Sequence, residues 1–235
     1  MLQVNVKLDL NEKLFLKNPQ ETELGRRIIE HSVLLFDELG FEAFTFRKLA
    51  KRMKSTEASV YRYFENKHYL FVYLVNWYWE WMNFRISFFT INLDHPEDKL
   101  QAALKAIVDI SKRNTPADYM DTEVLHRIVV TEGAKAYHQK NVDEENKYGF
   151  FLAYKKLCKK LADILLEIKP GYAYPKALAS MLLETANNNL YFAEHLPRLT
   201  DIEHAKGHKQ EILQMLWGFT MGCLSADFPQ FEGQE

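Results

Sequence analysis

Residues 45–64, TFRKLAKRMKSTEASVYRYF, contain two short stretches of helical periodicity separated by a polar break. Thr45 and Thr56 precede the two stretches, and threonine is a good N-cap residue because its hydroxyl accepts from a backbone N–H of the first turn. Lys54 and Ser55 interrupt the pattern between them. The segment therefore predicts two short helices joined by a tight turn. The apolar residues that define their inner faces recur every three or four positions: Phe46, Leu49, Ala50 and Met53, then Val60 and Phe64.

The same segment is strongly basic in a chain that is acidic elsewhere. Residues 45–70 contain seven Lys or Arg and two Glu, a local charge of +5, whereas the whole chain of 235 residues carries −2. The remaining residues therefore carry −7. A local basic surface on an acidic protein is typical of a site for a polyanion such as duplex DNA. A solvated helix face would also account for the charge.

The rest of the chain also predicts helices. Only nine Gly and seven Pro punctuate it, which favours long helices over many strands and turns. A first helix follows Pro19, and Gly40 supplies its left-handed C-terminal cap. We therefore expect an all-α fold. Further helices are expected after the Asn66 cap to about Ile91, and near 97–113, 121–138, 143–168, 174–195 and 206–226.

Residues 1–18 differ from the helical remainder. Apolar residues alternate with polar ones from Val4 to Leu10, which is the period of a strand, so a small hairpin is expected. The predicted organisation is an N-terminal arm at 1–18, a domain at 19–68 that contains the two short basic helices, and a helical domain at 69–235.

Several features favour a soluble cytoplasmic protein. The chain has two cysteines, Cys158 and Cys223, too few for a disulfide framework. The first residues carry acidic side chains and have no apolar core of a signal peptide. The most apolar region, 69–91, is interrupted by polar residues, whereas a membrane span needs about 20 largely uninterrupted apolar residues.

A bracing helix followed by a tight turn and a second helix is the helix-turn-helix motif, whose second helix enters the major groove. The run IIEHSVLLFDELGFEAFTFRKLAKRMKSTEASVYRYFENK resembles the DNA-binding domain of the TetR family of transcriptional regulators. One departure concerns the turn, where the family usually has a glycine followed by an apolar residue and this chain has Lys54 and Ser55. The residues that carry the resemblance are Ile28, Ile29, Phe36, Gly40, Phe41, Thr45, Leu49, Ala50, Ser59, Tyr61, Tyr63, Phe64 and Lys67.

The resemblance implies contacts with double-stranded DNA. Thr45, Tyr61, Tyr63 and Lys67 would contact phosphates, and the residues that open the second helix would face base edges. Several of these side chains also have a purely structural alternative: the two threonines as caps alone, Tyr63 as a core residue, and Lys48, Lys51 and Arg52 as solvated residues. The expected DNA-binding set is Thr45, Arg47, Lys48, Thr56, Glu57, Ala58, Ser59, Tyr61, Arg62, Tyr63 and Lys67.

The resemblance also implies that the helical domain at 69–235 binds an unknown small-molecule effector and forms a dimer. The segment 69–89 is crowded with aromatic residues, which suits either a cavity for an apolar effector or core packing between domains. The expected pocket residues are Trp77, Trp81, Phe84, Phe88, His126 and Tyr137.

Two apolar stripes near the C-terminus resemble the four-helix dimer interface of the family, although monomer core is an equal alternative. A two-fold dimer would place two recognition helices about 34–36 Å apart, one DNA turn, on a palindromic operator. The stripes are Leu178, Met181, Leu182, Ala186 and Leu190, and Leu213, Leu216, Phe219, Thr220 and Cys223.

Together these features predict a one-component, sequence-specific transcriptional regulator, a repressor released by an effector, that needs no cofactor. His204 and His208 have the spacing of a metal pair, but the sequence shows no third ligand near them. The chain has none of the nucleophile, Walker or zinc-protease motifs, so an all-helical enzyme is disfavoured. The main alternative is a helical small-molecule binding or interaction module that no longer reads DNA.

Overall fold

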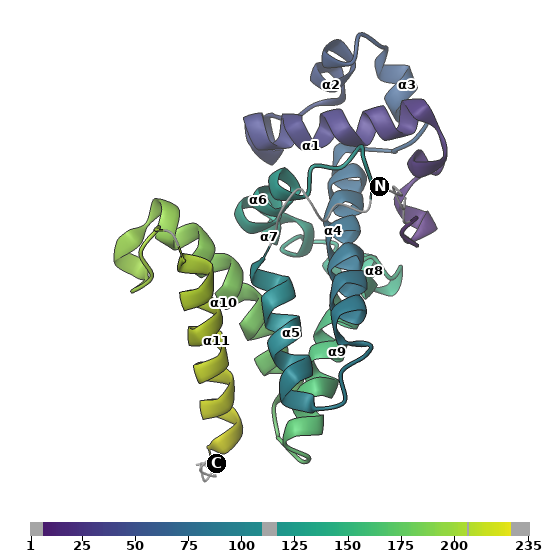
Figure 1. The fold of residues 1–235 in the computed structure, drawn as a ribbon. Coiled ribbons are helices and arrows are strands. Elements are labelled where there is room, and N and C mark those ends of the chain that lie inside the picture. Colours follow the sequence, from purple (N-terminus) through teal and green to yellow (C-terminus); the bar gives the residue numbers. More distant parts are fainter. Residues whose placement is uncertain (1–6, 110–116, 206, 227–235) are drawn as a thin grey trace, which may run out of the picture. The chain divides into compact units, whose positions relative to one another are not determined.

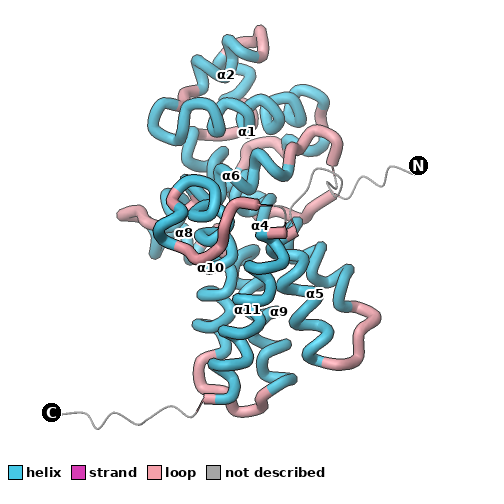
Figure 2. The backbone as a smooth tube through the Cα atoms, turned by 60° about the vertical axis from the view of Figure 1, so that its left-hand side comes forward, coloured by secondary structure: helices cyan, strands magenta, loops and turns pink. Residues whose placement is uncertain are grey.

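The computed structural model describes residues 7–109, 117–205 and 207–226, and every regular element in these ranges is a helix. The all-α prediction is confirmed, and Figure 2 shows helices joined by loops throughout the described chain. The chain divides into two compact units, residues 1–88 with 109–157 and residues 89–108 with 158–235. The division does not follow the expected boundary at residue 68, because helix α4 (Lys67–Thr90) lies almost wholly in the first unit.

The first unit begins with short elements and a long helix. Two turns of 3-10 helix, η1 (Glu12–Leu14) and η2 (Pro19–Glu21), precede α1 (Glu23–Ala43). Thr22 caps α1 by accepting from the amide of Gly25 at 3.0 Å. Gly40 has φ +72°, a left-handed conformation that glycine adopts without penalty. The regular part of α1 therefore ends where the sequence places its cap, and one further turn reaches Ala43.

The expected N-terminal hairpin does not form in the described residues. Residues 7–11 are irregular and η1 follows them, while Val4 and Val6 lie outside the described residues. Leu8, Leu10 and Leu14 are buried, so the apolar residues pack on the unit without pairing as strands. The amide of Leu16 donates to the carbonyl of Tyr63 at 2.8 Å. Tertiary burial has replaced the hairpin that the alternation predicts.

Next come α2 (Phe46–Arg52), α3 (Glu57–Tyr61) and α4 (Lys67–Thr90). Figure 1 shows α2 and α3 lying together beside α1, in agreement with their residue contacts. Four phenylalanines join α1 to α4. Phe36 stacks on Phe44 with ring centroids 3.8 Å apart, and Phe71 of α4 lies 5.2 Å from Phe36 and 5.0 Å from Phe41. This cluster fixes the start of α4 against the end of α1.

Helix α4 is apolar on all sides over much of its length. Asn66 caps it as expected, accepting from the amide of Tyr69 at 2.9 Å. Every residue from Leu70 to Trp79 is buried. A helix that is apolar all round must be covered all round. Within the first unit the covering elements include α1, α6 (Thr122–Glu132), α7 (Ala134–Tyr137) and α8 (Val142–Lys147).

Two predicted helices are broken by glycine. The helix expected at 121–138 divides at Gly133 into α6 and α7, and the helix expected at 143–168 divides near Gly149, which has φ +84°. After Gly149 the chain continues as α9 (Leu152–Ile168), which begins in the first unit and runs into the second. Helical periodicity persists across both breaks, which explains why it does not reveal them.

The second unit contains α5 (Pro96–Val108), α10 (Pro175–His195), η4 (Pro197–Leu199) and α11 (His208–Ser225). Helices α5, α10 and α11 pack against one another. Residues 110–113 of the helix expected at 97–113 lie outside the described residues. No helix in the described part of the chain is long and apolar enough to cross a membrane.

The aromatic cluster of the first unit generates a stability prediction. Phe36 is fully buried against three other phenylalanine rings. Phe36→Ala should lower the free energy of unfolding by about 3–5 kcal/mol, because the change removes buried apolar surface and leaves a cavity. Urea unfolding followed by circular dichroism measures the loss. Leu39→Ala, on the exposed side of the same helix, should change it by less than about 0.5 kcal/mol. Equal losses in the two variants would contradict this packing.

Candidate nucleic-acid interface

The two helices of the basic segment are both capped by threonine. Thr45 Oγ1 accepts from the amide of Lys48 at 3.2 Å, and Thr56 Oγ1 accepts from the amide of Ser59 at 3.3 Å. Both side chains remain exposed. Capping therefore does not remove either residue from the surface, and each can serve as a cap and also face a ligand.

The turn between α2 and α3 is a Schellman motif closed by lysine. The amide of Ser55 donates to the carbonyl of Ala50 at 2.9 Å, and the amide of Lys54 donates to the carbonyl of Lys51 at 3.2 Å. This pattern requires a left-handed residue after the helix, and Lys54 has φ +53°. Among the described residues Lys54 is the one non-glycine with positive φ. The turn geometry is thus kept at the expense of backbone strain.

Most of the expected contact residues lie at the surface. Arg47 and Lys48 project from the first turn of α2, and Lys48 Nζ folds back to the carbonyl of Ala43 at 2.7 Å. The ring of Tyr61 packs edge-on against Phe46 with centroids 4.9 Å apart, while the residue stays 49% exposed. The exposed members of the set are Thr45, Arg47, Lys48, Thr56, Glu57, Ala58, Tyr61 and Arg62.

Three expected contact residues have partners inside the protein. Ser59 is buried, and its hydroxyl lies 2.9 Å from Thr56 Oγ1. Tyr63 is buried, and its hydroxyl lies 2.7 Å from Thr22 Oγ1. Lys67 Nζ donates to the carbonyls of Phe41 and Glu42 at 3.1 and 3.2 Å. Ser59 bonds to the N-cap of its own helix, whereas Tyr63 and Lys67 hold the end of the motif and the start of α4 against α1. This differs from the expectation that all three face the DNA.

The surface of this segment is predominantly cationic. Arg47, Lys51 and Arg62 are exposed, and Lys54 is exposed in the turn. Arg52 Nη1 forms an ion pair with Glu38 at 2.5 Å, which offsets one positive charge of this surface. Glu57 is exposed at the start of α3 and is the acidic exception. A carboxylate there repels phosphates but can accept from cytosine N4 in the major groove.

The residues expected to line an effector pocket do not come together. Trp77 and Trp81 are fully buried, with rings stacked at a centroid distance of 6.4 Å. Phe84 and Phe88 are exposed on α4. The buried pair therefore fills the core, in agreement with the core-packing alternative, and the exposed pair lies farther along the same helix, toward its C-terminal end.

His126 and Tyr137 contact neighbours of the two tryptophans. His126 Nδ1 lies 2.9 Å from the hydroxyl of Tyr78, and Trp79 Nε1 donates to the hydroxyl of Tyr137 at 2.6 Å. Tyr78 is buried, and desolvation raises its pKa well above the usual value. These hydrogen bonds satisfy polar atoms between α4 and the helices α6 and α7, so the two residues have a structural role in this arrangement.

His204 and His208, which have the sequence spacing of a metal-binding pair, lie close together in the structure. The rings of His204 and His208 lie 5.1 Å apart between centroids. In the described part of the chain no group of three His, Cys, Asp or Glu is placed to hold a metal ion.

Comparison with known proteins identifies the basic segment. Residues 28–74 match the family model described as bacterial regulatory proteins, tetR family. This range contains α2, α3, the turn and the first part of α4. No curated protein matches the chain.

Solved structures share the fold at low sequence identity. One is AibR in complex with isovaleryl coenzyme A and operator DNA, 15% identical, covering 83% of this chain and 97% of its own, with a TM-score of 0.57. A second is the ketosteroid transcriptional regulator KstR2 of Mycobacterium tuberculosis, 17% identical, with coverages of 86% and 96% and a TM-score of 0.57. A third is a tetR-family regulatory protein from Rhodococcus RHA1, 13% identical, with coverages of 88% and 100% and a TM-score of 0.62.

The strained turn yields a testable prediction. A left-handed conformation costs an L-residue about 1–2 kcal/mol, and glycine avoids this but loses more entropy on folding. Lys54→Gly should therefore raise the free energy of unfolding by about 0.5–1 kcal/mol, measured by urea denaturation. Lys51→Gly, inside α2, should lower it by about 1 kcal/mol. A loss of stability in Lys54→Gly would show that the lysine side chain supports the turn.

Proposed function

We propose that this chain, which belongs to the tetR family of bacterial regulatory proteins over residues 28–74, is a one-component regulator that binds operator DNA as a homodimer and responds to a small-molecule effector. The observation that carries the proposal is the capped helix-turn-helix with exposed Arg47, Lys51 and Arg62. Residues 19–68 would form the DNA-binding module and residues 69–235 the effector-binding and dimerisation part, with residues 1–18 as an N-terminal arm.

We assign the proposed DNA contacts to those residues of the motif whose side chains are exposed. Thr56, Glu57 and Ala58 open α3 and are exposed, so they would face base edges in the major groove. Thr45 and Arg47 stand at the start of α2, where side chains and helix amides can meet phosphates. Tyr61 would add a hydroxyl contact at the other end of α3. Ser59 and Tyr63 are omitted from this set because they are buried, and Lys67 is omitted because its ammonium is bound to two carbonyls of α1.

The dimer surface would lie on the two C-terminal helices. Leu182 of α10 and Leu216 of α11 are buried within the second unit, so part of each stripe is monomer core. Phe219 is 53% exposed and Met181 is 46% exposed. An added Cβ at Gly222 would meet no atom within 4 Å. A large exposed ring beside open glycine positions suits close approach of a second copy of the helix.

Effector control would act through α4. The helix follows α3 directly, and its first turn is bound to the end of α1 through Lys67. A ligand that changes the tilt of α4 would move α3 with it, and binding to two half-sites would be lost when their spacing no longer fits. Release of a repressor is the simplest outcome of such a change.

Loss of surface groups on the motif tests DNA binding. Duplexes are selected from a random library with the full chain, and affinity for the selected duplex is then measured by mobility shift. Arg47→Ala should weaken binding about tenfold and reduce the salt slope by about one. Tyr61→Phe should weaken binding about threefold, because one hydroxyl contact contributes roughly 0.5–1.5 kcal/mol.

Arg198→Ala, an exposed cation of the second unit, is the matched control and should bind like the wild-type chain. Wild-type affinity in both Arg47→Ala and Tyr61→Phe would contradict the contact assignment. If no duplex is enriched, or if binding does not depend on salt, the alternative of a helical binding module that no longer reads DNA is favoured. The exposed Glu57 would support this alternative, because its carboxylate repels phosphates.

Self-association has its own test. Phe219→Glu places a charge on the exposed ring position and should convert the dimer to a monomer in size-exclusion chromatography with light scattering. Operator affinity should then fall by about tenfold or more, because two linked half-site contacts become independent. Leu16→Glu, an exposed apolar position of the first unit, should remain dimeric. A dimer that survives Phe219→Glu would place the interface elsewhere.

A further inference from the structure

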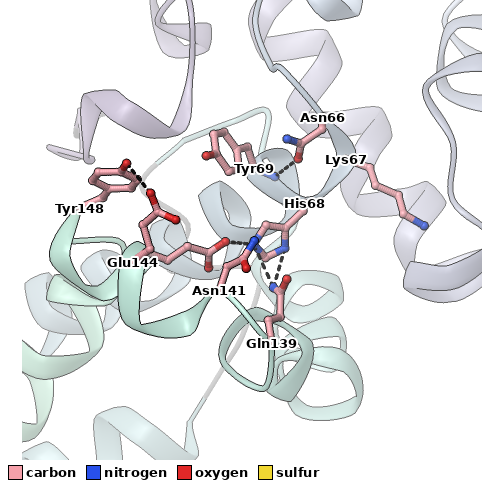
Figure 3. A pocket seen from close by; sticks show the side chains of 9 residues that line it. Asn66, Lys67, His68, Tyr69, Gln139, Asn141, Glu144 and Tyr148 are labelled. Carbon is pink, nitrogen blue, oxygen red and sulfur yellow. Dashed lines mark hydrogen bonds and ion pairs between the residues drawn. The ribbon is translucent and has the colours of Figure 1, made fainter.

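A polar cleft lies at the first turn of α4, where α8 and the loop before it approach this turn (Figure 3). Its volume is about 430 Å³, within the range of small-ligand sites. The cleft belongs wholly to the first unit. Its lining residues are Asn66, Lys67, His68, Tyr69, Gln139, Asn141, Glu144, Glu145 and Tyr148.

His68 lies between Gln139 and Glu145. Gln139 Nε2 lies 2.8 Å from His68 Nδ1 and 2.9 Å from His68 Nε2, and it donates to the carbonyl of Lys135 at 2.9 Å. His68 Nε2 also lies 2.8 Å from Glu145 Oε1. The imidazole therefore holds Glu145 through one of its two carboxylate oxygens.

Glu145 is a buried acid whose hydrogen-bonding capacity is only partly used. The residue is 6% exposed, and within the described structure its Oε2 has no hydrogen-bond partner. An ionised carboxylate accepts at both oxygens, and leaving one buried and unpaired costs free energy. A donor that reaches Oε2 would supply the missing interaction.

Two lysines near the cleft, Lys13 and Lys67, interact with groups other than its carboxylates. Lys67 Nζ is held by the carbonyls of Phe41 and Glu42, and Figure 3 shows its side chain extending away from the other lining residues. Lys13 Nζ lies over the ring of Tyr148 at 4.8 Å from its centroid. Neither ammonium forms an ion pair with Glu144 or Glu145 among the described contacts. The Lys13 contact also shows that the Tyr148 ring accommodates an ammonium group.

The raised pKa values of two tyrosines indicate a negative electrostatic potential in the cleft. Burial raises the pKa of Tyr69, and the carboxylates of Glu65, Glu145 and Glu144 raise it further. The pKa of Tyr148 is raised mainly by its hydrogen bond to Glu144 at 2.8 Å. A negative field of this kind opposes anions and favours cations.

We propose that the cleft binds a small organic cation, a protonated primary amine, through the carboxylates of Glu145 and Glu144. The rings of Tyr69 and Tyr148 would cover the alkyl part of the ligand and face its charge. An ammonium carries several donors, which match the unused carboxylate oxygen and the amide oxygens of the lining asparagines and glutamine.

Such a ligand would act at the joint between α4 and the helix-turn-helix. His68 follows Lys67, and Lys67 binds the last carbonyls of α1. A ligand that draws Glu145 from His68 would therefore change the first turn of α4. This effector role rests on the proposed DNA-binding function, whereas occupancy of the cleft does not.

The test uses calorimetric titration of the full chain, without DNA, with 1,4-diaminobutane. We expect saturable binding of one ligand per chain and no binding of 1,4-butanediol, its neutral isostere. Glu145→Gln keeps the hydrogen bond to His68 but removes the charge, so affinity should fall by about tenfold or more. Glu144→Gln, at an exposed position, should lower it by about threefold. Asp163→Asn, an acid paired with Lys159 on α9, should leave it unchanged.

The site would be overturned by the absence of saturable binding, by equal binding of the diol, or by Glu144→Gln and Glu145→Gln variants that fold and bind like the wild type. An equal loss of diamine affinity in Asp163→Asn would show non-specific charge attraction and reject the proposal. Stronger binding of MgCl2 than of the diamine would show a metal site and would also reject it. Operator affinity is then measured with saturating diamine. An unchanged affinity would reject the effector role alone, while failure to bind operator without diamine bears only on the proposed function.

Discussion

The burial of α4 on all sides is the constraint from which the arrangement of the first unit follows. From Leu70 to Trp79 no residue can face water, so the helix must be enclosed by α1 and by α6 to α8. The enclosure fixes the start of α4, where Phe71 meets Phe36 and Phe41. The enclosure also buries Trp77 and Trp81 in the core, so they do not line an effector pocket. At the first turn of α4 the covering elements leave a polar cleft.

The helix-turn-helix was predictable because its signals are local. Capping threonines, a three- and four-residue apolar repeat and a break of two residues each act within one helical turn. Even the departure at Lys54 was visible as a non-glycine where a left-handed residue is required, and its φ of +53° confirms it. The same local logic fails at Gly133 and Gly149, because the helices on either side keep one period across the break.

The side of the helix on which a residue lies was less predictable. Tyr63 and Tyr61 are two positions apart with the same chemistry, yet Tyr63 is buried on Thr22 and Tyr61 is exposed. The difference depends on where α1 lies, which is tertiary information. The pair His68 and Glu145 is separated by 77 positions, so no spacing rule could join them. The hairpin expected at the N-terminus failed for a related reason, since burial of Leu8 and Leu10 does not need strand pairing.

The position of Lys67 connects the proposed DNA surface with the cleft. Its ammonium satisfies two carbonyls at the end of α1, where a helix terminus leaves backbone acceptors without intrahelical partners. A cation at that end is also favoured by the helix dipole. If Lys67 instead turned to a DNA phosphate, those carbonyls would lose their donor and the link between α1 and α4 would weaken. Lys67 therefore stabilises the junction of α1 and α4 in this position, which a contact with DNA would weaken. Its neighbour His68, in the same turn of α4, lines the acidic cleft.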